Sequence, residues 1–333
     1  MQTATLTAMF NINNISRMGL GCMGISHAYN TPLPWEDAKT FIRQALELGV
    51  DSFDTASMYG LGENERLLGE ALESVRDKVF IASKCGLTTV DESGKEQRGI
   101  NNDPENLRRS CEQSLRRLKT DYIDLYYLHR WDKKTPIEDC VTTLADLVKQ
   151  GKIRAVGLSE VSAQTLRRAH AAYPVAAIQS EYSLWTRDPE NGLLDTCKEL
   201  GVTFVAFSPL ARGFFGGKAL QPDTFAQGDL RLAMPRFCGE NFRKNEQLLP
   251  AFYALAQQAG CTAAQLALAW LFHRPHEVYA IPGTTNISHL KENLGAKNIR
   301  LGTDIIEKLE KLINKNTVSG ERYNEKTFAE IDR

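Results

Sequence analysis

The chain has 333 residues, and its 40 lysines and arginines nearly balance 41 aspartates and glutamates, so the formal net charge is −1. This balance gives no sign of a basic surface for nucleic acid or for an anionic membrane. No apolar run could span a bilayer and no secretory signal opens the sequence, so we expect a cytoplasmic protein with neither a membrane nor a nucleic-acid partner.

Strands and helices are predicted to alternate from the start of the chain. Residues 1–17 are polar and would form a hairpin, and residues 18–24 would form a buried strand that ends in glycines. A helix is expected over 35–48, where apolar residues recur every three or four positions, and it stops at Gly49. A short buried strand over 50–54 follows it.

The alternation continues through the rest of the sequence. The further predicted strands cover 79–84, 122–129, 152–159, 176–180, 202–207 and 278–281. The further predicted helices cover 64–73, 103–119, 135–150, 162–173, 193–200, 241–259, 262–272, 288–297 and 304–315. Residues 208–240 are rich in Gly and Pro and would form a long loop, which usually belongs to a functional site, and the tail 316–333 is polar.

Eight strands that alternate with helices predict an α/β protein, a single-domain (β/α)8 TIM barrel with an N-terminal hairpin and extra C-terminal helices. A doubly wound sheet is the alternative, because residues 19–24 read G-L-G-C-M-G and match the dinucleotide-binding pattern G-x-G-x-x-G. That pattern needs a helix at its last glycine, whereas residues 26–34 contain two prolines before the next helix. The barrel is therefore favoured.

Polar residues follow three successive predicted strands. Asp54 and Tyr59 come after the second strand, Lys84 ends the third, and His129 ends the fourth. Each has an ordinary structural explanation, such as a hydrogen-bonded turn, a surface lysine or a core histidine. In a barrel, however, the strand ends converge on one face. Four ionisable residues at neighbouring strand ends therefore indicate a catalytic site.

These four side chains suit proton transfer to an oxygen atom. A nearby ammonium stabilises a phenolate and lowers the pKa of the phenol, which is the role we expect for Lys84 beside Tyr59. Asp54 would pair with Lys84 and offset the cost of burying it, and His129 would hold a substrate oxygen near Tyr59. The group supplies neither electrons nor a nucleophile. Carbonyl reduction by an external hydride donor is the reaction that fits.

Together with further motifs, these four residues make the sequence resemble the aldo-keto reductase family over almost the whole chain. The matching residues are 49–56, Tyr59, Gly60, Glu63, Lys84, 126–129, 151–159, Gln179, 207–210, 281–283, Glu292 and Asn293. The resemblance implies a TIM barrel that binds NADPH without a Rossmann domain. It also implies a catalytic tetrad of Asp54, Tyr59, Lys84 and His129, with Tyr59 as the general acid.

The resemblance implies cofactor contacts at the ends of the later strands. Ser159 and Gln179 would hold the nicotinamide carboxamide, and Phe207 or Tyr182 would offer an aromatic face to the ring. Gly24 would allow close approach of the backbone. The pyrophosphate segment would comprise Ser208, Pro209, Leu210, Arg212 and Gly213. The adenosine end, including the 2′-phosphate, would involve Gly283, Thr284, Thr285, His289, Glu292 and Asn293.

The sequence departs from the family pattern at two places. Glu160 stands where many members have Asn, next to the expected carboxamide contact. Gly283 and His289 stand where many members have Lys and Arg around the 2′-phosphate. Threonine hydroxyls and a helix N-terminus remain as phosphate donors. We therefore expect NADPH, with weaker use of NADH and a smaller preference than a Lys/Arg loop would give.

The substrate is expected to be a small carbonyl compound. Tyr29, Trp131, Tyr182 and Trp185 could wall an aromatic pocket, which favours a broad-range aldehyde or ketone reductase. Two other functions stay open. One is a cofactor-binding regulatory subunit, as in the family's potassium-channel β-subunits, and the other is a lyase that uses Lys84 as a Schiff base.

The cysteines and histidines give little sign of a metal site. The seven cysteines are scattered and form no C-x-x-C pair, a pattern typical of reduced thiols. His273 and His276 are close in sequence, but Pro275 would break the helix needed to align them. No metal is expected.

Overall fold

The centre of the molecule is a ring of eight parallel strands in the order β1-β2-β3-β6-β7-β8-β9-β10. The computed structural model describes residues 15–29, 31–90 and 96–332. The strands are β1 (Leu20–Gly21), β2 (Ser52–Asp54), β3 (Phe80–Cys85), β6 (Leu125–Leu128), β7 (Val156–Ser159), β8 (Ala177–Glu181), β9 (Thr203–Phe207) and β10 (Val278–Ile281). A parallel bridge between Met18 and Ala280 joins the two ends of the sheet, as a (β/α)8 TIM barrel requires.

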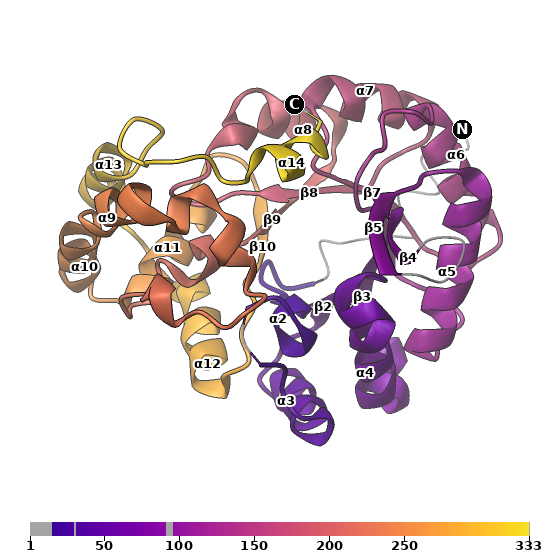
Figure 1. The fold of residues 1–333 in the computed structure, drawn as a ribbon, viewed down its shortest axis with the longest axis horizontal. Helices are drawn as coiled ribbons and strands as arrows, with labels where there is room; N and C mark the ends of the chain where they lie inside the picture. Colours follow the sequence, from indigo (N-terminus) through magenta and orange to yellow (C-terminus); the bar gives the residue numbers. More distant parts are fainter. Residues whose placement is uncertain (1–14, 30, 91–95, 333) are drawn as a thin grey trace.

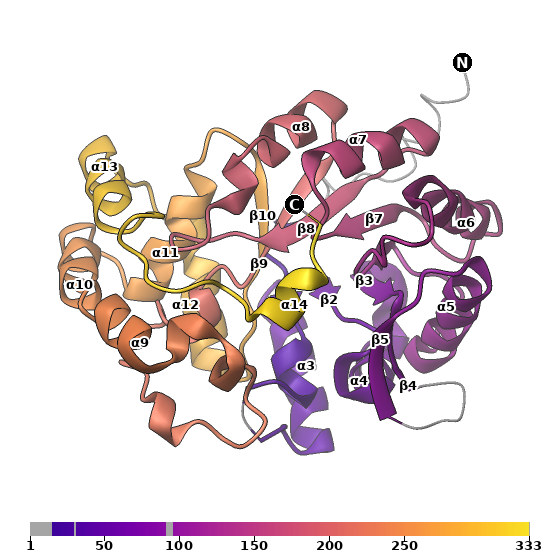
Figure 2. The ribbon, with the colours of Figure 1, turned by 45° about the horizontal axis from the view of Figure 1, so that its top comes forward.

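Helices surround this ring (Figure 1). The α-helices of the described residues are α2 (Met23–Ser26), α3 (Trp35–Glu47), α4 (Glu63–Leu72), α5 (Pro104–Leu118), α6 (Ile137–Lys149), α7 (Ala163–Ala172), α8 (Leu193–Leu200), α9 (Gly239–Glu246), α10 (Leu249–Gln258), α11 (Ala263–Phe272), α12 (Ile287–Gly295), α13 (Thr303–Leu312) and α14 (Glu325–Ala329). Figure 2 shows α14 and the C-terminus in front of the strands rather than in the outer ring. In the described part of the chain, no helix has the length and apolar character needed to cross a membrane.

Local signals place several helix ends where the sequence predicts them. Asp103 caps α5 by accepting a hydrogen bond from the Glu105 amide at 3.0 Å, and Pro104 occupies its first turn. The helices α3 and α8 are followed by Gly49 and Gly201, whose φ values of 86° and 66° lie in the left-handed region. Glycine adopts that conformation without the strain of a Cβ atom, so the chain can leave the helix and return to the barrel.

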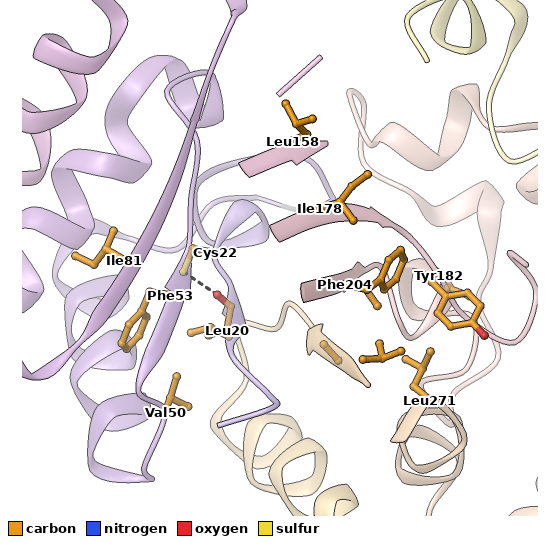
Figure 3. Close-up of a cluster of buried hydrophobic side chains, with 14 of the residues drawn as sticks. Leu20, Cys22, Val50, Phe53, Ile81, Leu158, Ile178, Tyr182, Phe204 and Leu271 are labelled. Carbon is orange, nitrogen blue, oxygen red and sulfur yellow. Dashed lines mark hydrogen bonds between the residues drawn. The ribbon is translucent and has the colours of Figure 1, made fainter. Parts of the chain in front are cut away.

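Two apolar layers lie on the two faces of the sheet. Ala177 belongs to the small cluster inside the barrel, whereas its neighbour Ile178 belongs to the large cluster between strands and helices. Figure 3 shows part of the outer cluster, which includes Ile178 and Phe204. Alternate residues of a strand point to opposite faces, so Gln179 shares the inner side with Ala177. This alternation decides which polar residues can face the mouth of the barrel.

The structure differs from the predicted elements in four places. The first strand is only two residues long, and α2 follows it directly. An antiparallel hairpin, β4 (Leu87–Val90) with β5 (Glu96–Ile100), was not predicted. The helix predicted over 241–259 is two helices, because Pro250, which lacks an amide hydrogen, begins a new helix in the first turn of α10. The polar tail contains α14. Residues 1–14 of the expected hairpin lie outside the described residues.

Candidate active site

Four side chains expected at the strand ends meet at one end of the barrel. Asp54 is the last residue of β2, Tyr59 opens the short helix after it, Lys84 lies in β3, and His129 directly follows β6. The Lys84 Nζ donates hydrogen bonds to Asp54 Oδ1, to the Thr55 carbonyl at 2.8 Å and to the Tyr59 hydroxyl at 3.3 Å. The rings of Tyr59 and His129 pack edge to face with centroids 5.9 Å apart. The structure therefore brings all four together.

The ion pair between Lys84 and Asp54 is almost completely enclosed. Lys84 is 0% exposed and Asp54 is 5% exposed, and Gln179 Nε2 donates to the second carboxylate oxygen of Asp54 at 2.7 Å. Burial lowers the pKa of Lys84, but the charges and hydrogen bonds of Asp54 and Tyr59 outweigh it, so the pKa is raised above its ordinary value. Lys84 is therefore held as an ammonium that points at a phenol.

Tyr59 keeps its proton more firmly than the sequence suggests. Burial raises the pKa of Tyr59 above its ordinary value, and the positive charge of Lys84 only partly offsets that rise. Sequence reasoning considered the ammonium but not the desolvation of the phenol, which is the larger effect. The hydroxyl is thus protonated at neutral pH. It has a cation beside it to stabilise the phenolate that proton donation would leave.

The residues expected to hold a nicotinamide lie on neighbouring strands, with one exception. Ser159 ends β7 opposite Gln179 in β8, and Phe207 ends β9. Tyr182 is 0% exposed, packs against Phe204 and Trp270, and so faces the outer core rather than the mouth. Of the two aromatic residues considered, only Phe207 is partly exposed.

Arg212 and the other residues expected to contact the pyrophosphate lie in a turn directly after β9. Ser208 and Arg212 have positive φ values of 51° and 56°, and Pro209, Leu210 and Gly213 complete the turn. The Arg212 guanidinium already donates to Glu181 Oε2 at 2.7 Å and to the Tyr323 hydroxyl at 2.9 Å. A phosphate bound here would have to share this arginine with Glu181.

The segment expected at the adenosine end begins in the loop after β10 and continues into α12. The Asn286 side chain accepts hydrogen bonds from the amides of Ser288 at 2.8 Å and His289 at 3.2 Å, so it already caps two amides that the sequence offered to a phosphate. Gly283, Thr285 and His289 are exposed, Thr284 and Glu292 are half-buried, and Asn293 is buried. None of the residues expected to bind the adenosine end is an arginine or a lysine. The exposed Lys291 lies in the same segment but was not among them.

A match between this sequence and the model of a protein family identifies the family. The model of the Aldo/keto reductase family matches residues 17–314. The chain belongs to this family. It is 43% identical over 310 residues to a probable aldo-keto reductase 1 of Glycine max, covering 93% of this chain and 88% of that protein.

Solved aldo-keto reductases and dehydrogenases have the same fold. A glycerol dehydrogenase from Gluconobacter oxydans is 30% identical with a TM-score of 0.80, and the match covers 90% of this chain and 91% of that chain. An aldo-keto reductase from Klebsiella pneumoniae, solved in complex with NADP and acetate, is 28% identical with a TM-score of 0.69, over 96% of this chain and 95% of that chain.

Glu160, the departure from the family pattern, connects the barrel to the C-terminal segment of this aldo-keto reductase. Its φ of 55° is a left-handed conformation that Asn tolerates better than Glu. Its carboxylate accepts hydrogen bonds from the Glu181 amide at 2.8 Å and from Arg322 Nη2 at 2.7 Å. Asp332 accepts from the Ser162 amide at 2.9 Å, further along the same segment. Glu160 thus anchors the end of the chain against the mouth.

Besides Tyr182, the aromatic residues expected at the substrate pocket are Tyr29, Trp131 and Trp185, and they have different surroundings. Tyr29 is half-buried, and its hydroxyl accepts a hydrogen bond from Arg212 at 3.2 Å. Trp131 is half-buried and donates to the Thr135 carbonyl at 2.7 Å. Trp185 is buried and stacks on Phe214 with centroids 4.5 Å apart. Trp185 is therefore part of an aromatic core cluster and does not line an open pocket.

Two neighbours of the tetrad were missed in the sequence. The His27 ring lies 5.4 Å from the Tyr59 ring, and burial lowers the pKa of His27, which favours its neutral form. Arg130 follows His129 and donates to the Ser159 hydroxyl at 3.2 Å. The signal that could have identified Arg130 in the sequence is its position directly after His129, at the end of a predicted strand.

Histidines considered for a metal have other partners. His273 Nδ1 lies 2.8 Å from the Ala269 carbonyl, and His276 Nε2 lies 2.8 Å from Asp195 Oδ1. Over residues 15–29, 31–90 and 96–332, no three His, Cys, Asp or Glu side chains form a group that could hold a metal ion.

Proposed function

We propose that this chain reduces aldehydes or ketones to alcohols with NADPH as the hydride donor and Tyr59 as the general acid. The single observation that carries the proposal is the enclosed Lys84 ammonium, which bonds both Asp54 and the Tyr59 hydroxyl. The similarity to a Klebsiella pneumoniae aldo-keto reductase solved with NADP supports the choice of cofactor.

The residues present fit a nicotinamide cofactor at the mouth. Ser159 offers a hydroxyl and Gln179 an amide on adjacent strands, with Phe207 on the next strand. A Cβ atom at Gly21 would lie 2.7 Å from the Ile281 carbonyl and 3.6 Å from the Gly283 amide, so only glycine allows these two loops to approach. When bound, the cofactor would supply a hydride to the carbonyl carbon.

The chain's own residues would supply the proton. Tyr59 donates its hydroxyl proton to the carbonyl oxygen as that oxygen gains negative charge, and the product is an alcohol. Lys84 stabilises the phenolate that remains, and Asp54 fixes Lys84 in place. His129, packed edge-on against Tyr59, orients the substrate oxygen. Bulk water then returns the proton to Tyr59.

The burial of Lys84 argues against the lyase alternative. A Schiff base needs a neutral amine with access to a carbonyl carbon. Lys84 is 0% exposed, makes three hydrogen bonds, and has a raised pKa because its partners outweigh the effect of burial. This environment suits a fixed cation and not a nucleophile.

The absence of arginine and lysine among the residues expected at the adenosine end supports a modest preference for NADPH over NADH. His289 and Thr285 are exposed there, and Asn286 already caps two amides of α12. We expect NADPH to be used better than NADH by a smaller factor than a loop with Lys and Arg would give. A ratio of kcat/KM for the two cofactors above several thousand would contradict this placement of the phosphate.

The test follows the oxidation of NADPH by absorbance with an aromatic aldehyde, methylglyoxal and pyridoxal. Tyr59→Phe should lower kcat by about 10²–10⁴-fold, the usual contribution of a general acid, and leave the Kd for NADPH within about twofold. Tyr126→Phe is the matched control, because this buried tyrosine belongs to the outer cluster and its hydroxyl lies near Ser114. If Tyr59→Phe kept more than a tenth of the wild-type kcat, another group would be the acid.

A further inference from the structure

Arg130 is a buried guanidinium that no described carboxylate neutralises. It is 7% exposed, and its Nη1 donates to the His129 carbonyl at 2.7 Å and to Ser159 Oγ at 3.2 Å. By contrast, the buried Arg212, Arg231 and Arg322 each pair with a carboxylate at 2.7 Å. A buried charge without a counter-charge is costly, so an anion is expected at Arg130 in the working protein.

One edge of this guanidinium is unused. Nε is fully buried and has no hydrogen-bond partner among the described residues. Nη2 also donates to none of them, and unlike Nε it is not completely enclosed. Nε and Nη2 form one side of the planar group, with two parallel N–H bonds that match the two oxygens of a carboxylate. Nη1 anchors the arginine, whereas this edge has no partner among the described residues.

Arg130 lies close to the reacting groups. It directly follows His129 at the end of β6, and its hydrogen bond to Ser159 reaches the end of β7. Burial raises the pKa of Tyr59, and Arg130 is one of the cations whose charge opposes that rise, so the guanidinium is within electrostatic reach of the acid. An anion held at Arg130 would therefore lie close to the carbonyl group that Tyr59 protonates.

The cofactor does not account for this cation. The phosphate groups of NADPH are expected at the turn after β9 and at the loop after β10. The group expected beside Ser159 is a neutral carboxamide. The anion at Arg130 must then come from the other ligand of the site.

We propose that Arg130 binds a carboxylate of the substrate, so that the preferred substrates are aldehydes or ketones that also carry a carboxylate. This inference rests on the proposed carbonyl reduction for the reaction itself, while the carboxylate contact depends on Arg130 alone. The contact forms in the ground state and persists in the transition state. Its loss should therefore appear mainly in KM rather than in kcat.

The kinetic test compares carboxybenzaldehydes with their methyl esters, which keep the aldehyde and lose the charge. The 2-, 3- and 4-substituted acids vary the spacing between carbonyl and carboxylate. The wild type should use the best acid at least about tenfold better in kcat/KM than its ester. Arg130→Met should bring that ratio close to one, and Arg130→Lys, which keeps the charge without the planar edge, should give an intermediate ratio.

The ratio is the readout because Arg130 also holds the His129 carbonyl and Ser159, so its loss can slow both substrates. Arg167→Met is the matched control, since Arg167 is a surface arginine paired with Glu199, and its removal should leave the ratio unchanged. A wild-type ratio near one, or the same ratio in Arg130→Met, would overturn the proposal. So would a Kd for NADPH that rises more than the KM of the acid, because Arg130 would then serve the cofactor.

A binding measurement separates this inference from the reaction. Calorimetry with 4-(hydroxymethyl)benzoate and its methyl ester needs no turnover. Binding of the acid but not of the ester, lost in Arg130→Met, would support the carboxylate site even if no aldehyde were reduced, and the proposed reaction alone would then have failed. Equal binding of acid and ester would overturn the carboxylate site even if aldehydes were reduced.

Discussion

Replacing Asp54 by Asn should destabilise the protein by leaving Lys84 buried without its counter-charge. Removing one partner of a buried ion pair costs about 3–5 kcal/mol. The Thr55 carbonyl still accepts a hydrogen bond from Lys84 at 2.8 Å, so we expect the lower end of that range. A loss of about 3 kcal/mol corresponds to a decrease of about 6 °C or more in Tm for a domain of about 150–250 residues, and this longer chain should show a somewhat smaller shift.

The double variant Asp54→Asn/Lys84→Met distinguishes charge from packing. It removes both charges from an environment in which neither is solvated, and replacement of a buried pair by neutral groups is often neutral in stability. We expect it to recover to within about 1 kcal/mol of the wild type. The measurement is urea unfolding followed by circular dichroism at pH 7, with Tm at a fixed scan rate. A double variant no more stable than Asp54→Asn would refute the reasoning.

The dependence on pH gives a second check. In the wild type the raised pKa of Lys84 contributes stability below the ordinary lysine pKa of about 10.4, and this contribution is lost as the pH rises through the folded-state pKa. In Asp54→Asn the largest remaining influence on the pKa of Lys84 is burial, which lowers that pKa. The unfolded chain then binds more protons than the folded one, so the cost of the substitution should shrink from pH 7 to pH 9. A constant cost over that range would contradict this explanation.

Two further substitutions test packing and the C-terminal anchor. Gly69→Ala places a Cβ atom 2.5 Å from the backbone at the end of α5, and should cost about 1–3 kcal/mol in urea unfolding despite the better helix propensity of Ala. Gly24→Ala is the control for stability, because its Cβ would meet only the Tyr29 ring at an ordinary contact distance of 3.6 Å. Arg322→Met breaks the buried pair with Glu160 and should expose the C-terminal segment to chymotrypsin at least about tenfold faster, since each 1.4 kcal/mol is a factor of ten. An unchanged cleavage rate would show that the segment is held by other contacts.

The barrel and the grouping of Asp54, Tyr59, Lys84 and His129 at its mouth could be predicted from patterns along the sequence. Gly49 and Gly201 end helices wherever the chain must turn back to the barrel, and their positive φ values follow from the residue type. Once the strands are placed, the rule that strand ends share one face brings Lys84 and Asp54 together without any knowledge of their contact. The family resemblance and the geometry thus agree on these positions for a physical reason.

Contacts between distant segments were not predictable from local patterns. Arg322 lies in a C-terminal segment whose only recognisable pattern is its polar composition. No neighbouring residue indicates that Arg322 pairs with Glu160, 162 residues away in the sequence. The pKa of Tyr59 depends on burial by residues from several strands, an effect that a strand pattern does not contain. Tyr182 was considered for the mouth because its aromatic ring could stack on a nicotinamide, but its position in the strand alternation turns it toward Trp270.

The anchoring of the C-terminal segment has a consequence for synthesis of the chain. Arg322 is made 162 residues after Glu160, which at about 5–20 residues per second is an interval of about 8 to 32 s. During that interval β8, β9 and β10 complete the eight strands of the barrel, but the carboxylates of Glu160 and Glu181 lack one of the cations that they contact in the finished molecule. These carboxylates are therefore expected to stay more hydrated until the segment that contains Arg322 leaves the ribosome. Closure of this side of the mouth would then be among the final events of folding.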